Sequence, residues 1–577
     1  MMRKNVRPFP AVSVFSCFMF LFLFFGTTES RAANPDGHIT AWVFLTDKGA
    51  LEGLRRSVPE DVVSDRSIRR RLKVRSADQV VDYSDLPVDE TYVSRIRERV
   101  LRVRQRSKWF NAVSVVASRA QLAGLLELPF VRSIEPVARF RRNNPGFRAH
   151  QGEARRGHAT VLTLDYGESY VQDSLINVPA VHATGNYGQG VIVGMFDNGV
   201  RLPEHEAFDS LNIIATHDFV DHKESVVPNN PDFSFGSHGV YTLSAIGGNK
   251  PGLLIGPAFG ASYILARTEN DSSETPIEED NWVAAMEWAD SIGVDVTSTS
   301  LGYFSYDPPY ESWTWEDMNG NTTVITRAAD MAVARGIVVV NSAGNAGGDP
   351  THNTLVAPSD GDSVLAIGAV ISTGERANFS SVGPTTSNPP RIKPDVMAQG
   401  VNVFVASGIN PDGYGGVSGT SLSCPLAAGV AALIIHDRPT ATPVEIADAM
   451  RNTSSNAGSP NNEYGWGILD ALAAIQYLTP TGAGQGPSLP AEFRLDQNFP
   501  NPFNPSTQIS FEVAGEGVVS LRVYDLLGRE VATLANERLS SGAHVRTWDA
   551  AGQSGGVYFY RLRSGNSVET RKMILMK

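Results

Sequence analysis

Cysteine is scarce in this chain, whose 577 residues contain two, Cys17 and Cys424. Cys17 lies in an apolar N-terminal run, so removal of that run leaves one cysteine and excludes an internal disulfide. Stability must then come from packing and from polar contacts. Charged residues make up 19% of the chain and apolar residues 42%. That composition is typical of a globular protein and excludes a largely disordered one.

The sequence also lacks the alternation of basic and aromatic residues that is typical of nucleic-acid binding. Residues 51–160 carry a net charge of +10 and residues 161–577 one of −24. Such a balance suits either a nucleic-acid partner or two parts of one chain that complement each other. We favour the second interpretation and expect no nucleic-acid partner.

Long apolar runs are confined to the N-terminus, and we expect no membrane-spanning segment after it. Basic residues precede the apolar run 11–26, and small and polar residues follow it. This order predicts a secretory signal peptide, to which we assign residues 1–33. The run is near the lower length limit of a spanning helix, so an N-terminal anchor is the alternative.

The remaining chain changes its pattern several times. Residues 34–137 predict a small α/β unit, and the charged, Gly-containing segment 138–174 predicts an exposed, cleavable linker. In residues 175–478 short apolar strands alternate with helices, which predicts a parallel sheet covered on both faces. A Pro/Gly linker, 479–492, leads to residues 493–577, whose alternating strands predict a small all-β sandwich.

Periodicity places the elements of the two larger units. The predicted strands are 38–45, 112–118, 190–196, 261–266, 337–343 and 363–370, and the predicted helices are 61–75, 89–100, 120–128, 281–293 and 326–336.

Several polar residues follow the predicted strands of the central unit. Asp197 comes directly after strand 190–196, and functional residues gather beyond the carboxyl ends of parallel strands. His238 follows a Ser-type N-cap at the start of an uncharged helix, and Asn345 lies in a Gly-flanked turn. Each residue taken alone fits a structural role equally well.

The stretch GVSGTSLSCPLAAGVAALI, residues 416–434, crowds hydroxyl and thiol groups in front of an uncharged apolar run. Proline is tolerated in the first turn of a helix, so Pro425 predicts a helix that begins close to Ser421–Cys424. Free N–H groups and a partial positive charge at that end can stabilise an oxyanion on a serine.

The chain order Asp197, His238, Ser421 is the subtilisin order, distinct from those of chymotrypsin and the α/β-hydrolases. The motifs VIVGMFDNGV, SHGVYTLSAIGG, STSLGY, SAGN and GTSLSCP accompany it. With these motifs, residues 175–478 resemble the subtilisin-like (subtilase, S8) serine proteases. The resemblance implies a subtilisin-like α/β fold and a secreted serine endopeptidase that is made as an inactive precursor.

The resemblance also implies roles for individual residues. Ser421 would be the nucleophile, His238 its general base and Asp197 the residue that orients the imidazole. Asn345 and the backbone N–H of Ser421 would form the oxyanion hole. The edge that pairs with an extended substrate would be Ser300, Leu301 and Gly302.

The sequence departs from the family motifs beside these positions. Asn198, Val240 and Leu426 stand where the family usually has other residues. These departures put the substrate preference and the rate in doubt more than the activity itself. The alternative to an endopeptidase is a catalytically degenerate surface binding or adhesion protein. We interpret Cys424 as a packed small residue, with a second reactive nucleophile as the alternative.

The flanking units resemble known accessory domains. Residues 34–137 resemble the family's propeptide, which binds its own protease in cis, and maturation would fall within 138–175. The tail, with FPNPFNPST, resembles the sorting domain of the type IX secretion system, and a plain β-sandwich stalk is the alternative. These resemblances imply a secreted or cell-surface protein that uses the type IX machinery.

The acidic stretch 269–280 offers candidate ligands for a structural calcium ion, but its spacing is irregular and we favour a solvated loop. We assign no other metal ligands and expect no cofactor in catalysis. We expect a monomer that acts on protein or peptide substrates.

Overall fold

The computed structural model describes residues 38–54, 62–137, 164–479 and 493–576, apart from short gaps at 231, 233–234, 309, 311, 350, 496–497, 499–500, 502, 514–516, 540–541 and 566. The predicted signal peptide (1–33) and most of both predicted linkers (138–174 and 479–492) lie outside the described residues. The chain divides between Thr479 and Pro480 into two compact units.

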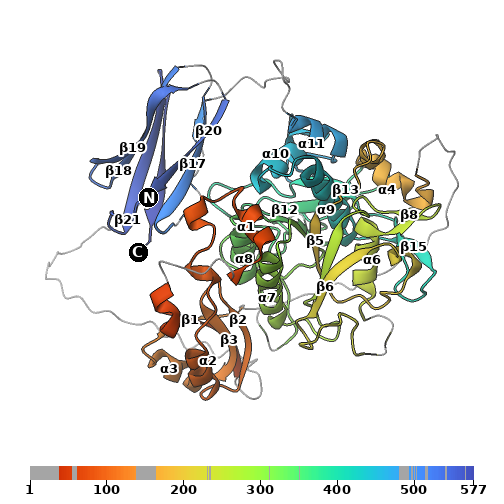
Figure 1. The fold of residues 1–577 in the computed structure, drawn as a ribbon, viewed down its shortest axis with the longest axis horizontal. Coiled ribbons are helices and arrows are strands. Elements are labelled where there is room, and N and C mark those ends of the chain that lie inside the picture. Colours follow the sequence, from red (N-terminus) through yellow and green to blue (C-terminus); the bar gives the residue numbers. More distant parts are fainter. Residues whose placement is uncertain are drawn as a thin grey trace, which may run out of the picture. The chain divides into compact units, whose positions relative to one another are not determined.

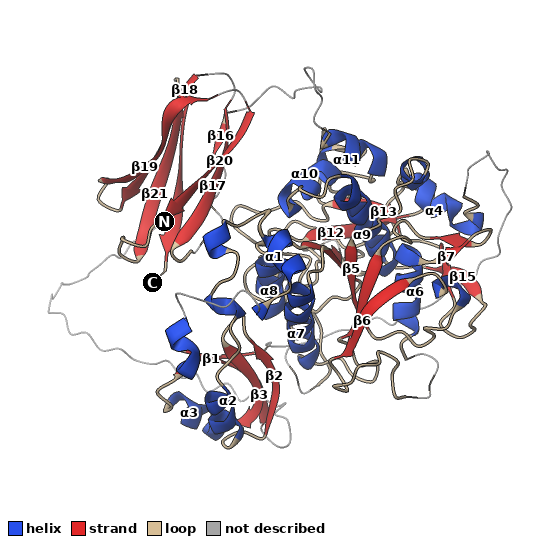
Figure 2. Ribbon diagram, in the orientation of Figure 1, coloured by secondary structure: helices blue, strands red, loops and turns tan. Residues whose placement is uncertain are grey.

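A seven-stranded sheet with the order β13-β12-β11-β10-β5-β9-β6 is the centre of the first unit (Figures 1 and 2). Every neighbouring pair in it is parallel. Most of its strands are buried along their whole length, as expected when helices cover both faces. The strands are β5 (Ile192–Asp197), β6 (Asn212–Asp218), β9 (Ser262–Arg267), β10 (Val296–Thr299), β11 (Val338–Ser342), β12 (Leu365–Val370) and β13 (Val396–Gln399).

Helices pack on both faces of this sheet, which confirms the predicted fold class. Successive side chains of a strand point to opposite faces, so Val193 of β5 belongs to the core beneath α6 and α9, and Ile192 to the core beneath α7 and α8. The helices are α4 (Tyr170–Leu175), α5 (Val178–His182), α6 (Ser237–Gly247), α7 (Ile277–Ile292), α8 (Val324–Val333), α9 (Thr420–Asp437), α10 (Pro443–Asn452) and α11 (Ala471–Tyr477). Two small antiparallel pairs are β7 (Asn249–Lys250) with β8 (Leu254–Ile255) and β14 (Val403–Ala406) with β15 (Tyr414–Val417).

Helix α9 is long and apolar enough to cross a membrane, with a mean hydropathy of 1.3 over 18 residues. Among the described residues it is the one helix of this kind, and the sequence had predicted none beyond the N-terminus. Because 83% of the segment is buried in the protein, α9 is the core helix of the sheet.

Residues 38–137 form a four-stranded antiparallel sheet with the order β2-β3-β1-β4. Successive side chains of strand β1 alternate between two hydrophobic cores. Val43 and Leu45 pack beneath α2 and α3, whereas Trp42 and Phe44 enter the core that contains α7 and α8. One face of this sheet is therefore buried against the central unit. The elements are β1 (His38–Leu45), α1 (Asp65–Arg71), α2 (Glu90–Arg97), β2 (Arg102–Ser107), β3 (Ala112–Ser118), α3 (Arg119–Leu126) and β4 (Val131–Pro136).

Two details of this unit differ from the sequence predictions. Helix α1 is shorter than the predicted segment 61–75, because the N–H groups of Lys73 and Val74 turn back to carbonyl groups three residues earlier. Strand β2 was not predicted, since its sequence RVRQRS carries three arginines and lacks an apolar face.

The second unit is a β-sandwich, as the alternation of its sequence predicts. Sheets of three strands (β16-β17-β20) and four strands (β19-β18-β21-β22) enclose one core. The strands are β16 (Arg494–Leu495), β17 (Ser506–Val513), β18 (Gly517–Asp525), β19 (Glu530–Leu539), β20 (Gly542–Asp549), β21 (Gly556–Ser564) and β22 (Ser567–Leu575).

Candidate active site

Three adjacent strands bring the predicted site residues to one edge of the central sheet. Asp197 is the last residue of β5, Ser300 follows β10 directly, and Asn345 comes three residues after β11. Strand β10 pairs in parallel with β5 on one side and with β11 on the other. The carboxyl ends of all three strands therefore meet at the same edge.

Asp197 and His238 are joined by a hydrogen bond of 2.7 Å between Oδ1 and Nδ1. Asp197 also accepts hydrogen bonds from the backbone N–H of Asn198 (2.8 Å) and from the hydroxyl of Thr242 (2.8 Å). A carboxylate held in this way keeps the ring proton of His238 on Nδ1 and leaves Nε2 as an acceptor. Thr242 was missed from sequence, although it lies one helical turn after His238 in α6.

The charges around His238 decide its pKa. Burial lowers this pKa, but the charge and hydrogen bond of Asp197, followed by the charge of Asp271, outweigh burial and raise it. Asp271 accepts hydrogen bonds from Asn198 Nδ2 (2.6 Å) and from the backbone N–H of Gly236 (3.2 Å). Sequence reasoning missed this effect of Asp271, because the residue lies in the stretch interpreted as a solvated loop.

The start of α6 differs from the predicted Ser-type N-cap. Ser237 is already helical, and Gly236 is the N-cap, with a left-handed φ of 73°. A Cβ at Gly236 would lie 2.8 Å from Pro228 Cγ. A Cβ at Gly239 would lie 1.8 Å from the carbonyl oxygen of Gly199. Glycine on both sides of the histidine thus lets α6 approach the Asp197 loop closely.

Ser421 is the second residue of α9 and is partly exposed. Its hydroxyl donates to the backbone carbonyl of Ser300 at 3.2 Å. No hydrogen bond joins Ser421 to His238 within the described part of the chain. The structure therefore links Asp197 to His238 directly, whereas the Ser421 hydroxyl is bonded to the carbonyl of Ser300, a residue of the predicted substrate edge.

Pro425 lies deeper in α9 than predicted. The helix begins at Thr420, which makes Pro425 its sixth residue, beyond the first turn. Because proline has no N–H, the carbonyl of Ser421 lacks its usual helical donor. The hydroxyl of Ser300 donates to that carbonyl at 2.7 Å and replaces the missing bond.

Asn345 is exposed and is oriented by Thr420. Its Oδ1 accepts hydrogen bonds from the backbone N–H and from the hydroxyl of Thr420, both at 2.9 Å. This leaves Nδ2 available as a donor. A Cβ placed on Gly419 would lie 3.8 Å from Asn345 Nδ2 and 3.6 Å from the backbone nitrogen of Ser421, so the two nitrogens border the same space.

The predicted substrate edge, Ser300, Leu301 and Gly302, lies beside Val356. Within the described residues, the backbone N–H and C=O of Gly302 have no hydrogen-bond partner. A Cβ on Gly302 would lie 2.2 Å from a methyl group of the half-buried Val356, and one on Gly344 would lie 3.1 Å from the other methyl group. Val356 therefore fills the space between the two glycines, a contact that sequence reasoning missed.

Cys424 is a packed residue, as we interpreted it from sequence. It is fully buried, and its thiol contacts the carbonyl oxygen of Thr299 at 3.4 Å. Burial raises the pKa of the thiol to about 12, so a thiolate does not form near neutral pH. The neighbouring Ser423 hydroxyl donates to the carbonyl of Thr420 within the helix (2.9 Å).

The acidic stretch 269–280 is only in part the solvated loop that we favoured, since Asp271, Ser272 and Glu274 are exposed and its two ends are buried. Helix α7 begins at Ile277, and Glu269 and Glu278 are buried. Carboxylate oxygens of Glu269, Glu274 and Glu278 lie within 4.8 Å of one another. Burial, followed by the charges of neighbouring carboxylates, raises the pKa of Glu278 to about 9 and that of Glu274 to about 7. The carboxylates thus form a cluster that is chemically suited to a hard cation.

A parallel sheet that carries aspartate, histidine and serine in this chain order defines a serine peptidase of the subtilisin type. A family model described as the subtilase family matches residues 188–467. Subtilisin DY from Bacillus licheniformis is 33% identical over 302 residues, which are 52% of this chain and 97% of that protein. A subtilisin from Bacillus pumilus is 32% identical over 304 residues, again 52% and 97% of the two chains. The chain belongs to the subtilase family of serine peptidases.

The flanking units match models of their own. A peptidase S8 propeptide domain described for Bacteroidota matches residues 40–151, and a secretion-system C-terminal sorting domain matches residues 497–576. The sorting domain directs export through the type IX secretion system, to the cell surface or beyond it. Among solved structures, MycP1 from Mycobacterium smegmatis is 21% identical, with a TM-score of 0.44, over 59% of this chain and 94% of that one.

We expect the bond from the Ser300 hydroxyl to the orphaned carbonyl of Ser421 to be measurable in a double-mutant cycle. Ser300→Ala leaves this partly buried carbonyl without a donor and should destabilise the protein by about 1–3 kcal/mol. In a Pro425→Ala background the new N–H can donate to that carbonyl, so the same change should cost clearly less. Urea unfolding in a Ser421→Ala background, which prevents self-digestion, measures both values. Equal costs in the two backgrounds would contradict this explanation.

Proposed function

We propose that this subtilase is a secreted endopeptidase that hydrolyses peptide bonds through an acyl-enzyme formed on Ser421. The observation that carries the proposal is the 2.7 Å hydrogen bond between Asp197 and His238, at the sheet edge where the start of α9 places Ser421 beside Ser300. We further propose that the enzyme acts as a monomer on protein or peptide substrates.

The proposed reaction begins when the Ser421 hydroxyl leaves the Ser300 carbonyl and turns to His238 Nε2. Such bonds are often unmade in free enzymes and form when substrate binds. His238 takes the hydroxyl proton as Ser421 Oγ attacks the scissile carbonyl, and later gives it to the leaving amine. Asp197 stabilises the imidazolium in between, consistent with its effect on the pKa of His238.

The oxyanion of the tetrahedral intermediate would be stabilised by Asn345 Nδ2 and the backbone N–H of Ser421. Thr420 supports this role, because its two bonds to Oδ1 fix the amide in advance of the reaction. Donors that are already oriented stabilise developing charge without the cost of reorganisation.

The substrate would bind as an extended strand on Ser300, Leu301 and Gly302, where the free N–H and C=O of Gly302 can pair with its backbone. The side chain on the acyl side of the cleaved bond would then point toward the space between Gly302 and Gly344. Since Val356 fills that space, we propose a preference for small residues such as Ala or Ser at this position.

We also propose that Glu269, Glu274 and Glu278 hold a structural calcium ion. They would supply carboxylate oxygens, fewer than the six to eight oxygens that Ca²⁺ usually takes. The raised pKa values of the cluster support a cation, which would keep these groups ionised.

Calcium should then raise the melting temperature of the wild-type protein but not that of Glu278→Gln. An equal shift in both proteins would contradict the site.

Two substitutions separate the endopeptidase from the alternative, a binding or adhesion protein with the same fold. Ser421→Ala should lower kcat on the order of 10⁶-fold, and Asn345→Ala should lower it about 10²–10³-fold. A fluorophosphonate should label Ser421 once the propeptide is removed. The alternative predicts no labelling and an unchanged biological effect of Ser421→Ala.

The charge of Asp271 should set the pH dependence of the reaction. Because His238 must be neutral to accept a proton, its raised pKa moves the acid limb of the kcat/KM profile to higher pH. Asp271→Asn removes one of the charges that raise this pKa, so the acid limb should move to lower pH. An unchanged or opposite shift in the pH profile would show that Asp271 is not coupled to His238.

Val356 should control the size of the accepted side chain. Val356→Gly empties the space between Gly302 and Gly344, so cleavage after large side chains should increase relative to cleavage after Ala. A peptide library that is varied on the acyl side of the cleaved bond measures this ratio for both enzymes. Identical cleavage profiles would rule out Val356 as the determinant.

A further inference from the structure

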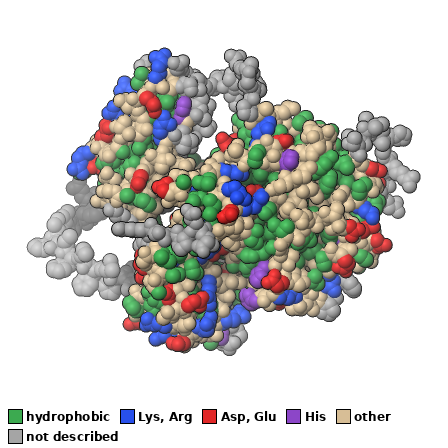
Figure 3. All heavy atoms as spheres, viewed as in Figure 1, with side chains coloured by type: hydrophobic (Ala, Val, Ile, Leu, Met, Phe, Trp, Pro, Cys, Tyr) green, Lys and Arg blue, Asp and Glu red, His purple; other side chains and the backbone are tan. Residues whose placement is uncertain are grey.

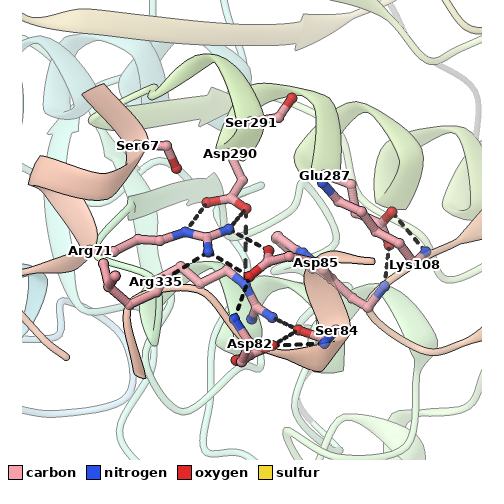
Figure 4. Close-up of polar contacts among 12 residues, drawn as sticks. Ser67, Arg71, Asp82, Ser84, Asp85, Lys108, Glu287, Asp290, Ser291 and Arg335 are labelled. Atoms are coloured by element: carbon pink, nitrogen blue, oxygen red, sulfur yellow. Dashed lines mark hydrogen bonds and ion pairs between the residues drawn. The ribbon is translucent and has the colours of Figure 1, made fainter. Parts of the chain in front are cut away.

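The propeptide helix α1 buries two arginines in the catalytic part of the chain. Arg70 is 2% exposed and Arg71 is fully buried, and both donate to the carboxylate of Asp290, which is also fully buried. Figure 4 shows the fork of Arg71 between Asp290 of α7 and Asp85. The contacts from Arg71 to Asp85 are a two-bond pair of 2.7 Å each.

The catalytic part forms a socket that fits these guanidinium groups. The carbonyl oxygens of Val294 and Arg335 accept hydrogen bonds from Arg70 at 2.7 and 3.0 Å. Gly293 and Gly336 have left-handed φ values of 101° and 88°. A Cβ on either glycine would lie 2.8 Å from atoms of α1, so only glycine permits this approach. We call Asp290, Gly293, Val294, Arg335 and Gly336 the arginine socket.

The arginine socket lies at the opposite edge of the central sheet from the catalytic residues. Val294 precedes β10 and Gly336 precedes β11, whereas Ser300 and Asn345 follow these strands. From Asp295 to Ser300 the chain spans five residues of extended backbone, about 16 Å. A peptide in the active site therefore does not touch the socket.

The pKa of Asp290 in the socket depends on the arginines of the propeptide. Burial raises the pKa of Asp290, but the charges of Arg70, Arg71 and Arg335 outweigh it and hold this pKa below its usual range. Without α1, the Asp290 carboxylate keeps one cation, Arg335, at 4.0 Å. If Arg70 and Arg71 are replaced while α1 stays bound, Asp290 keeps a buried charge that is no longer compensated, which is strongly unfavourable. Binding of α1 in the socket therefore depends on these two arginines.

We propose that the arginine socket is a second attachment point for the propeptide, one that does not depend on the active site. It holds the propeptide after the linker is cut, and a peptide that fills the active site does not displace it. Its partner is an arginine-bearing helix, supplied here by α1. This proposal requires no catalytic role for Ser421.

The test uses the full chain with Ser421→Ala and a recognition site for an added protease inserted within residues 138–163. After the cut, size-exclusion chromatography and the rate of fragment separation report whether the propeptide stays bound. We expect the fragments to co-elute, and Arg70→Met with Arg71→Met to speed separation on the order of 10²-fold or more. An excess of substrate peptide should not speed separation of the unsubstituted fragments.

Arg69→Met is the matched control. Arg69 precedes Arg70 in α1 but is exposed, and Lys and Arg side chains gather on the surface over α1 (Figure 3). This substitution should leave the separation rate unchanged. Sodium chloride should also have little effect, since buried pairs are screened much less than surface charges. A steep salt dependence would show that the surface charges hold the propeptide instead.

The proposal is overturned if the double variant separates at the unsubstituted rate, or if substrate peptide releases the propeptide. If the double variant does not fold, Arg66→Met replaces it. Arg66 lies at the rim, with its side chain 33% exposed, and donates to the Gly190 carbonyl (2.7 Å) and to Asp295. Its substitution should speed separation by a smaller factor, and an unchanged rate would overturn the proposal as well.

Discussion

The parallel pairing of β5, β10 and β11 is the constraint on which the site depends. In this register the strands end together, and the residues that follow them come from positions more than 140 apart in the chain, from Asp197 to Asn345. No local sequence signal could bring them together. Helices α6 and α9 then add His238 and Ser421 from one face of the sheet, and both helices begin at glycine N-caps that permit close approach. The sheet therefore sets the positions of Asp197, Ser300 and Asn345, and the two helices add His238 and Ser421.

The sequence was sufficient for the fold class and for placing the motif residues in it, because they lie at strand ends and helix starts that periodicity can locate. It was insufficient where a role depends on contacts across the chain. Thr242 and Asp271 act through Asp197 and His238, and Val356 acts by filling space between two glycines. None of these effects has a signature in the residues next to it.

The distribution of charge along the sequence correctly indicated a contact between the basic segment and the acidic body, but it did not show which residues make the contact. The basic segment does meet the acidic body, but the pairs that carry the contact are buried, as with Arg71 and Asp290. A count of charges along the sequence cannot distinguish such buried pairs from solvated side chains such as Arg69. The same ambiguity affected the acidic stretch, where Glu278 is a buried residue of a helix.

Ser300 and Ser421 exchange hydrogen bonds in both directions, since each hydroxyl donates to the carbonyl of the other residue. This reciprocal clasp fastens the backbone that receives the substrate to the backbone that carries the nucleophile. In the proposed reaction the Ser421 hydroxyl turns away, but the bond from the Ser300 hydroxyl to the Ser421 carbonyl remains. The segment proposed to receive the substrate and the helix start that carries the proposed nucleophile therefore stay joined while that hydroxyl moves.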